Sequence, residues 1–220
     1  MSRIRIFTGH FGSGKSEIAI NYALNLAKSG KKVSLVDIDI VNPYFCIRDL
    51  KAPLESKGVR VISADPSFSN AELMVVPPEV SSAFNDKSSE VVMDIGGDNT
   101  GATVLGQYNA YLKEEDYDLY FVINNNRPLT LDSEAVEEQI KAIESSSRLK
   151  ITYLISNTNL SYETTTEHIL KGDKDTYETS KRLNIPYKYV VCRRDMVDSI
   201  KDKVHAQILP IDIYMKPPWR

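Results

Sequence analysis

The segment Gly9–Ser16, which reads GHFGSGKS, constrains the fold of this chain more than any other feature. It follows an apolar run at 3–8 that predicts a strand, and apolar residues recur at helical spacing from about Lys15 to Ser29. A strand, a glycine-rich turn and a helix in this order predict an α/β fold with the turn at the carboxyl edge of a sheet. The eight residues fit the pattern G-x-x-x-x-G-K-[ST] in full: Gly9, His10, Phe11, Gly12, Ser13, Gly14, Lys15 and Ser16.

This pattern indicates a phosphate-binding loop. Its glycines allow backbone conformations that turn successive N–H groups inward, and the helix N-terminus attracts anions. Lys15 is expected to contact the β- and γ-phosphates, and the Ser16 hydroxyl is expected to ligate Mg²⁺. The alternative is a structural turn that merely contains Gly-Lys, which the full match at both the strand end and the helix start disfavours. We therefore predict a nucleotide–Mg²⁺ site.

The rest of the chain alternates between apolar runs and amphipathic stretches. Strands are expected at 32–39, 59–63, 90–97, 118–124, 151–157 and 186–192, and helices at 131–147 and 175–184. This alternation predicts a mostly parallel sheet of about seven strands, flanked by helices on both faces. Because the sequence shows no linker or repeat, residues 1–220 are expected to form a single domain.

Acidic residues follow two of the predicted strands. Asp94 ends the fourth strand in the position of a Walker B aspartate, which orders the Mg²⁺ shell through water. Gly97 is expected to bring its N–H to the γ-phosphate, with Asp98 beside it. Asp37 and Asp39 end the second strand on alternate faces. For each aspartate taken alone, capping a helix or solvating a loop is the alternative.

Composition and charge exclude several classes of protein. The net charge of -3 and the interspersed charges argue against a dedicated nucleic-acid binder. No apolar run approaches the roughly 20 residues of a membrane span, no signal peptide precedes the loop, and residues 208–220 resemble no membrane anchor. Cys46 and Cys192 are isolated, so we expect reduced thiols, a cytoplasmic protein and no metal cluster held by one chain.

The segments GHFGSGKS, VDIDIVNPYF and VVMDIGGD resemble the CobQ/CobB/MinD/ParA group of P-loop proteins, within the SIMIBI class. The resemblance runs from Ile4 to about Val191. That group includes cell-division and plasmid-partition ATPases, the nitrogenase iron protein and metallocentre-maturation NTPases. The segments DIDIVNPYF, DIGGD and NNNRP are similar to a narrower ATP-binding subgroup.

The resemblance implies further roles. Asp39 would be the switch I aspartate that orients the attacking water near Mg²⁺, Asp94 the Walker B residue and Asp98 an acidic residue of switch II. Asn157 matches the asparagine that hydrogen-bonds adenine, which implies ATP rather than GTP, and an Asx-turn is its alternative. The implied switch loops are 39–46 and 94–101.

The loop departs from the group at His10. Many members carry there a second lysine that reaches across a dimer to the partner's nucleotide. Histidine is shorter and largely neutral at pH 7, so activation in trans through this residue is in doubt, although a homodimer is compatible with the sequence.

Three functions remain open. The first is a slow ATPase that acts as a nucleotide-dependent switch on a protein or metallocentre target. The second is a small-molecule kinase or ATP-dependent ligase like the dethiobiotin and cobyrinate enzymes, in which Asp39, Asp65 or Arg127 would face a second substrate. The third is a nucleotide-binding module with little turnover. His168 and His205 have no metal-like spacing and are expected at the surface.

Overall fold

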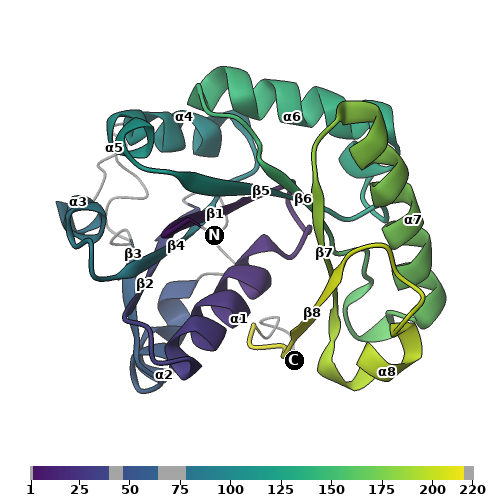
Figure 1. Ribbon diagram of the computed structural model, residues 1–220, viewed down its shortest axis with the longest axis horizontal. Helices are drawn as coiled ribbons and strands as arrows, with labels where there is room; N and C mark the ends of the chain where they lie inside the picture. The colour runs from purple at the N-terminus through teal and green to yellow at the C-terminus, as the bar shows by residue number, and fades with distance from the viewer. Residues whose placement is uncertain (1, 40–46, 64–77, 216–220) are drawn as a thin grey trace.

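The computed structural model describes residues 2–39, 47–63 and 78–215. Within these ranges, eight strands form one sheet in the order β3-β2-β4-β1-β5-β6-β7-β8, and each neighbouring pair is parallel (Figure 1). The strands are β1 (Ile4–Thr8), β2 (Val33–Ile38), β3 (Val59–Ser63), β4 (Glu90–Ile95), β5 (Tyr117–Ile123), β6 (Tyr153–Ser156), β7 (Tyr187–Arg193) and β8 (Gln207–Ile211).

Helices cover both faces of the sheet (Figure 1). One face carries α1 (Lys15–Lys28) and α2 (Lys51–Glu55). The other face carries five helices: α3 (Pro78–Asn85), α4 (Asn99–Gln107), α5 (Asn109–Glu114), α6 (Ser133–Ser147) and α7 (Thr166–Leu183). The short helix α8 (Val197–Ile200) packs against α7. Single 3₁₀ turns occur at Ile47–Leu50, Pro128–Thr130, Ser161–Glu163 and Arg194–Met196. The predicted α/β fold is confirmed.

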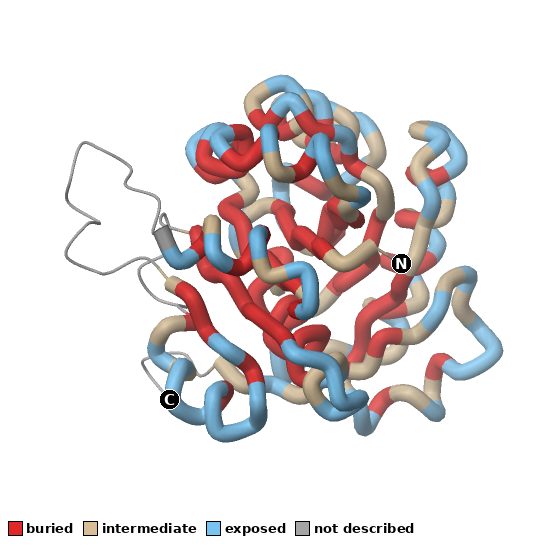
Figure 2. Tube along the Cα trace, turned by 60° about the vertical axis from the view of Figure 1, so that its left-hand side comes forward, coloured by how far each residue is buried: buried red, intermediate tan, exposed pale blue. Residues whose placement is uncertain are grey.

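The core lies on both faces of the central strands, which are buried along their length (Figure 2). Alternate residues of a strand point to opposite faces, so Ile4 and Ile6 pack with the cluster under α4 and α6. Phe7 points the other way, towards α1, and stacks on Tyr120 with ring centroids 5.0 Å apart. Because both faces are covered, β1, β2 and β4 read as nearly continuous apolar runs.

The structure differs from the expected elements in its extra short helices, α2 to α5 and α8, in one further strand and in the start of one helix. The sheet has an eighth strand, β8, where no element was expected. Pro210 is accommodated because, among the described strands, β8 lies at the sheet edge and pairs with β7 alone. The helix expected at 175–184 begins earlier, at Thr166, because Thr165 and His168 form a capping box there. The helices expected at about 15–29 and 131–147 are present as α1 and α6.

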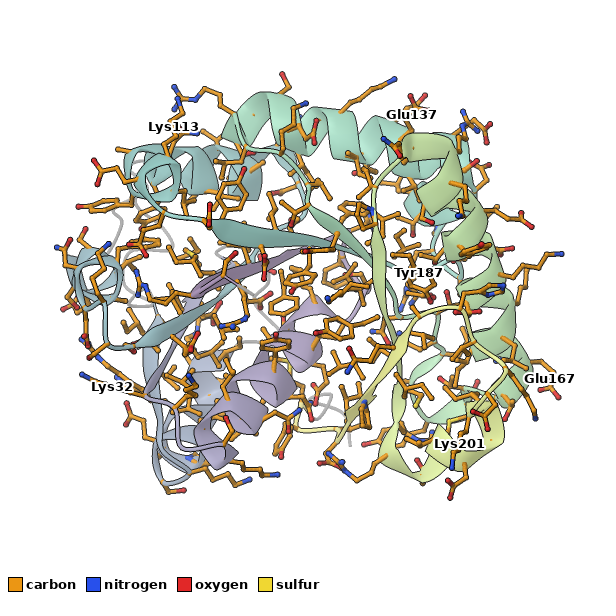
Figure 3. The ribbon with its side chains drawn as sticks, viewed as in Figure 1. Lys32, Lys113, Glu137, Glu167, Tyr187 and Lys201 are labelled. Carbon is orange, nitrogen blue, oxygen red and sulfur yellow. The ribbon has the colours of Figure 1, made fainter. Side chains whose placement is uncertain are left out.

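Charged side chains surround the molecule. The labelled residues Lys32, Lys113, Glu137, Glu167 and Lys201 project outward in Figure 3. No helix in the described ranges combines the length and apolar character needed to cross a bilayer.

Candidate functional site

The carboxyl ends of all the strands lie at one edge of the sheet, because the strands are parallel. The residues predicted for the site follow these ends: the loop after β1, Asp39 after β2, Gly97 and Asp98 after β4, and Asn157 after β6. β1 lies between β4 and β5 at the centre of the sheet. The fold therefore places residues from distant parts of the chain around the loop Gly9–Ser16.

The loop turns sharply into α1. Gly12 and Gly14 have φ angles of 79° and 84°, the left-handed region that favours glycine, and α1 begins at Lys15. A Cβ on Gly14 would lie 2.3 Å from Nδ2 of Asn157, and one on Gly12 would lie 2.7 Å from Nε of Arg127. Both glycines are therefore required by backbone conformation and by close neighbours. His10 Nδ1 lies 3.0 Å from the Phe11 carbonyl oxygen.

Asparagine side chains from two strand ends hold the loop from outside. Nδ2 of Asn157 donates to the carbonyl oxygen of Ser13 at 2.7 Å, and Nδ2 of Asn124 donates to that of Gly12 at 3.1 Å. Asn124 Oδ1 accepts from the N–H of Asn159 at 3.2 Å, which ties the turns after β5 and β6 together. Asn124 was not among the predicted site residues, and the polar run Asn-Asn-Asn directly after an apolar strand was the signal for it.

Lys15 forms a buried ion pair with Asp39. Its Nζ lies 2.7 Å from Oδ2 of Asp39, and the two side chains are 6% and 7% exposed. Burial by itself lowers the pKa of Lys15, but the carboxylates of Asp94, Asp39 and Asp37 outweigh it and raise the pKa above its ordinary value. Lys15 is therefore charged, and its charge is directed at the Asp39 carboxylate.

Two more carboxylates, those of Asp94 and Asp37, lie close enough to Lys15 to affect its pKa. Asp94 is buried beside the Ser16 hydroxyl, which acts to lower the pKa of its carboxyl group, and its Oδ1 atom has no hydrogen-bond partner among the described residues. Asp37 accepts from the backbone N–H groups of Asp39 and Ile47, at 3.3 and 3.1 Å. Burial raises the pKa of both Asp94 and Asp37 above the ordinary value. The site thus gathers three carboxyl groups around Lys15, with Arg48 as a further cation acting on Asp37.

This donor set fits Mg²⁺. Carboxylate and hydroxyl oxygens are the hard ligands that Mg²⁺ prefers, and it usually takes one or two protein groups together with phosphate oxygens and water. The described residues contain no group of three or more His, Cys, Asp or Glu side chains arranged to hold a metal. The fit rests instead on the Ser16 hydroxyl and on Oδ1 of Asp94, a buried acceptor for which residues 2–39, 47–63 and 78–215 supply no hydrogen-bond donor.

The segment after β4 packs directly on the loop. A Cβ on Gly97 would lie 1.9 Å from the carbonyl oxygen of Gly9, so Gly97 is in backbone contact with the first loop glycine. A Cβ on Gly96 would lie 3.2 Å from Oδ1 of Asp39. Asp98 is exposed and caps α4, since its Oδ1 accepts from the N–H of Gly101 at 2.8 Å. Asp39 and the start of this segment are thus brought together, while the Asp98 carboxylate acts as a helix cap.

A cavity of ≈ 250 Å³ opens beside the loop. It is lined by the start of α1, by the turn after β6 and by the ends of β7 and β8, including Ser16, Asn157, Arg193, Ile213 and Met215. Arg127 also lines it, beside Gly12. Its apolar lining comes from Phe11, Ile169, the ends of β7 and β8 and the residues after β8, and its polar lining includes the loop and the turn after β6. Residues 40–46, which make up the implied switch loop 39–46 except for Asp39, lie outside the described residues. Asp65 also lies outside them.

Comparison with known proteins gives the same class. The ParA family model described as NUBPL iron-transfer P-loop NTPase matches residues 1–86. Among solved structures, the cell division protein FtsY from Thermotoga maritima has 21% identity and a TM-score of 0.56, over 84% of this chain and 60% of that one. Chloroplast FtsY from Physcomitrella patens has 14% identity and a TM-score of 0.56, over 84% and 57%.

A structure of FlhF complexed with GTP/Mg²⁺ has 14% identity and a TM-score of 0.50, over 77% of this chain and 60% of that one. The chain therefore spans about 60% of the length of each of these three structures. No curated protein sequence matches it. The predicted resemblance to the SIMIBI class is confirmed by the family match and by the shared fold.

Proposed function

We propose that this chain, which has the fold and the loop of the SIMIBI-class P-loop NTPases, is a cytoplasmic protein that binds ATP with Mg²⁺ and hydrolyses it slowly, as a nucleotide-dependent switch. The observation that carries this proposal is the buried ion pair between Lys15 and Asp39. The lysine expected to hold the β- and γ-phosphates is paired with the aspartate that begins switch loop 39–46. Nucleotide binding would therefore change the partner of Asp39.

The switching step follows from charge. When a triphosphate occupies the loop, its β- and γ-oxygens compete with Asp39 for Nζ of Lys15. Asp39 is then released towards the solvent side of the site, where it is placed to orient a water molecule for attack on the γ-phosphorus. Loss of the γ-phosphate restores the ion pair. The equilibrium between the two arrangements depends on what is bound, as a switch requires.

Mg²⁺ would be held by the Ser16 hydroxyl and, through water, by Asp94, with Asp39 as a further oxygen donor, and it supplies charge neutralisation of the phosphates. The protein's own part is to position them. The N–H groups around Gly12 and Gly14 would bind the phosphates, and Gly97, packed on Gly9, would respond to the γ-phosphate through the loop. Asp98 would act in switch II once its cap on α4 is released.

The position of Asn157 supports ATP over GTP. Its Nδ2 is already used as a donor to the loop, at Ser13, and the side chain also lines the cavity. One N–H of Nδ2 is used in that bond, so the second N–H and the Oδ1 acceptor are left to recognise a base. A donor beside an acceptor matches adenine, whose 6-amino group donates and whose adjacent ring nitrogen accepts, whereas guanine presents its O6 acceptor in place of the amino group.

For the target, the matched family description supports a metallocentre as one candidate, because it names an iron-transfer protein. A protein partner is the other candidate. The small-molecule kinase or ligase remains the alternative function, in which a metabolite rather than water would meet the γ-phosphate near Asp39 or Arg127.

Calorimetric titration with ATP and with GTP in the presence of Mg²⁺, followed by phosphate release on the same samples, tests the proposal. We expect ATP to bind more tightly than GTP and to be hydrolysed slowly. Lys15→Ala should abolish binding, and Lys28→Ala is the matched control, since it removes an exposed lysine from the same helix. Light scattering on these samples reports whether ATP produces a homodimer.

Two outcomes would refute the proposal. If neither nucleotide binds, the loop does not act as a nucleotide site. If phosphate release is negligible alone but rises sharply with a metabolite that becomes phosphorylated or ligated, the alternative function is correct.

A further inference from the structure

The segment Asp212–Met215, which follows β8, lies on helix α1 rather than on another strand. Figure 1 shows the chain leaving β8 towards α1. The Asn21 side chain takes the place of a neighbouring strand there: its Oδ1 accepts from the N–H of Asp212, and its Nδ2 donates to the carbonyl oxygen of Asp212, both at 2.8 Å. Asn21 is buried, so this pair of hydrogen bonds is shielded from water.

A second contact lies one helical turn earlier, on the same face of α1. The buried carboxylate of Glu17 accepts hydrogen bonds from the backbone N–H of Tyr214 and, at 3.2 Å to Oε2, from that of Met215. Glu17 directly follows Ser16, the last residue of the phosphate loop. The start of α1 therefore carries the residues expected to contact phosphate, Lys15 and Ser16, next to the residue that binds this segment, Glu17.

These contacts decide which side chains of the segment meet the cavity. The backbone groups that α1 binds belong to Asp212, Tyr214 and Met215. Ile211, Ile213 and Met215 line the cavity, whereas Asp212 and Tyr214 do not. This is the alternation of an extended chain, in which successive side chains point to opposite sides. A shift by one residue would turn Asp212 and Tyr214 into the cavity, so the register set by α1 keeps this wall apolar.

Burying a carboxylate and an amide at these two positions is costly unless each is hydrogen-bonded. Here their described partners include backbone groups of the segment, and Asn21 also donates to the carbonyl oxygen of Glu17 at 2.9 Å. An apolar side chain at either position would fill the same space without fixing the register. The hydrogen bonds to Asp212–Met215 therefore explain why the residues at positions 17 and 21 are polar although they are buried.

We propose that Glu17 and Asn21 are positioning residues that fix Asp212–Met215 as the apolar wall of a purine-base pocket. The inference rests on the proposed function and adds the origin of its base-dependent affinity. The flat apolar face of a purine fits against Ile213 and Met215, while the phosphates are bound by Gly9–Ser16 and do not reach the wall. Loss of the wall should therefore weaken the binding of a nucleotide but not the binding of an inorganic phosphate chain.

The experiment compares ATP with inorganic tripolyphosphate, both with Mg²⁺, by calorimetry. Asn21→Ala, Glu17→Ala and Ile213→Ala should each bind ATP about tenfold or more weakly, with tripolyphosphate affinity within about twofold of the parent. Ile213 is 37% exposed, so its truncation leaves folding intact. Glu17→Gln keeps an acceptor oxygen and should recover most of the loss seen in Glu17→Ala. Asn25→Ala, an exposed asparagine one turn further along α1, is the matched control.

Tripolyphosphate binding also shows that the loop of each variant is folded. Equal losses for ATP and tripolyphosphate would overturn the inference, because the two residues would then support the loop rather than the wall. Unchanged ATP affinity in all three alanine variants would overturn it too. If the parent bound tripolyphosphate but gained nothing from the nucleoside, the proposed function itself would fail, before any variant is considered.

Discussion

Replacing Asp39 by asparagine removes the charge that faces Lys15 and keeps the shape of the side chain. With Nζ and Oδ2 2.7 Å apart and both side chains less than a tenth exposed, the pair is a strong competitor for any incoming phosphate. At an effective dielectric constant of about 20, the gross attraction is about 6 kcal/mol. The cost of desolvating both groups offsets much of it, so we expect a net competition of about 1.4–2.8 kcal/mol.

In the variant this competition is absent. ATP should therefore bind about 10- to 100-fold more tightly when Mg²⁺ is removed with EDTA. With Mg²⁺ and saturating ATP, phosphate release should fall by about 10²- to 10⁴-fold if Asp39 orients the attacking water. Calorimetry gives the first quantity and a phosphate assay the second. Asp86→Asn is the control, since Asp86 precedes β4 and so lies towards the opposite edge of the sheet.

Weaker ATP binding by Asp39→Asn in EDTA would refute this reasoning, because Asp39 would then be aligning Lys15 for the phosphate instead of competing with it. Hydrolysis at the parent rate would separately refute the role of Asp39 in positioning water.

Three further predictions concern the loop, the acid stability and the free thiol. Gly97→Ala places a Cβ 1.9 Å from the carbonyl oxygen of Gly9, so the loop must move, and ATP affinity should fall about tenfold or more; unchanged calorimetric affinity would contradict the contact. A hydrogen bond from Lys32 lowers the pKa of Asp86 from 3.8 to about 2, so charged Asp86 stabilises the fold above pH 3.8 and this contribution is lost as the pH falls towards 2. The free energy of unfolding in urea should therefore decline less steeply between pH 6 and pH 2 in Asp86→Asn than in the parent. An identical decline in both proteins would contradict this role of Asp86. Burial raises the pKa of the Cys192 thiol to about 11. Iodoacetamide at about pH 8 should therefore modify this thiol far more slowly in the native chain than in the urea-unfolded chain, as measured by peptide mass spectrometry. Equal rates of modification would show that the thiol is accessible in the native chain.

Local patterns in the sequence determined the class of the fold and the location of the loop. The segment Gly9–Ser16 is contiguous, and its glycines, lysine and serine have roles that follow from backbone conformation and charge. Seven strands were predictable because each contains a short, largely apolar run. β8 was missed because Pro210 lies within its five residues, and proline inside an apolar run argues against a strand except at the edge of a sheet.

Only the tertiary structure decided what surrounds the loop. Asn157 holds the Ser13 carbonyl across a sequence separation of 144 residues, and Glu17 holds Tyr214 across 197. The pairing of Lys15 with Asp39 likewise depends on β1 and β2 ending at the same edge of the sheet. No local periodicity encodes such contacts, because they arise when parallel strands bring their carboxyl ends together. The sequence therefore determined which residues carry the phosphate chemistry, and the packing of the sheet decided which partners hold them in place.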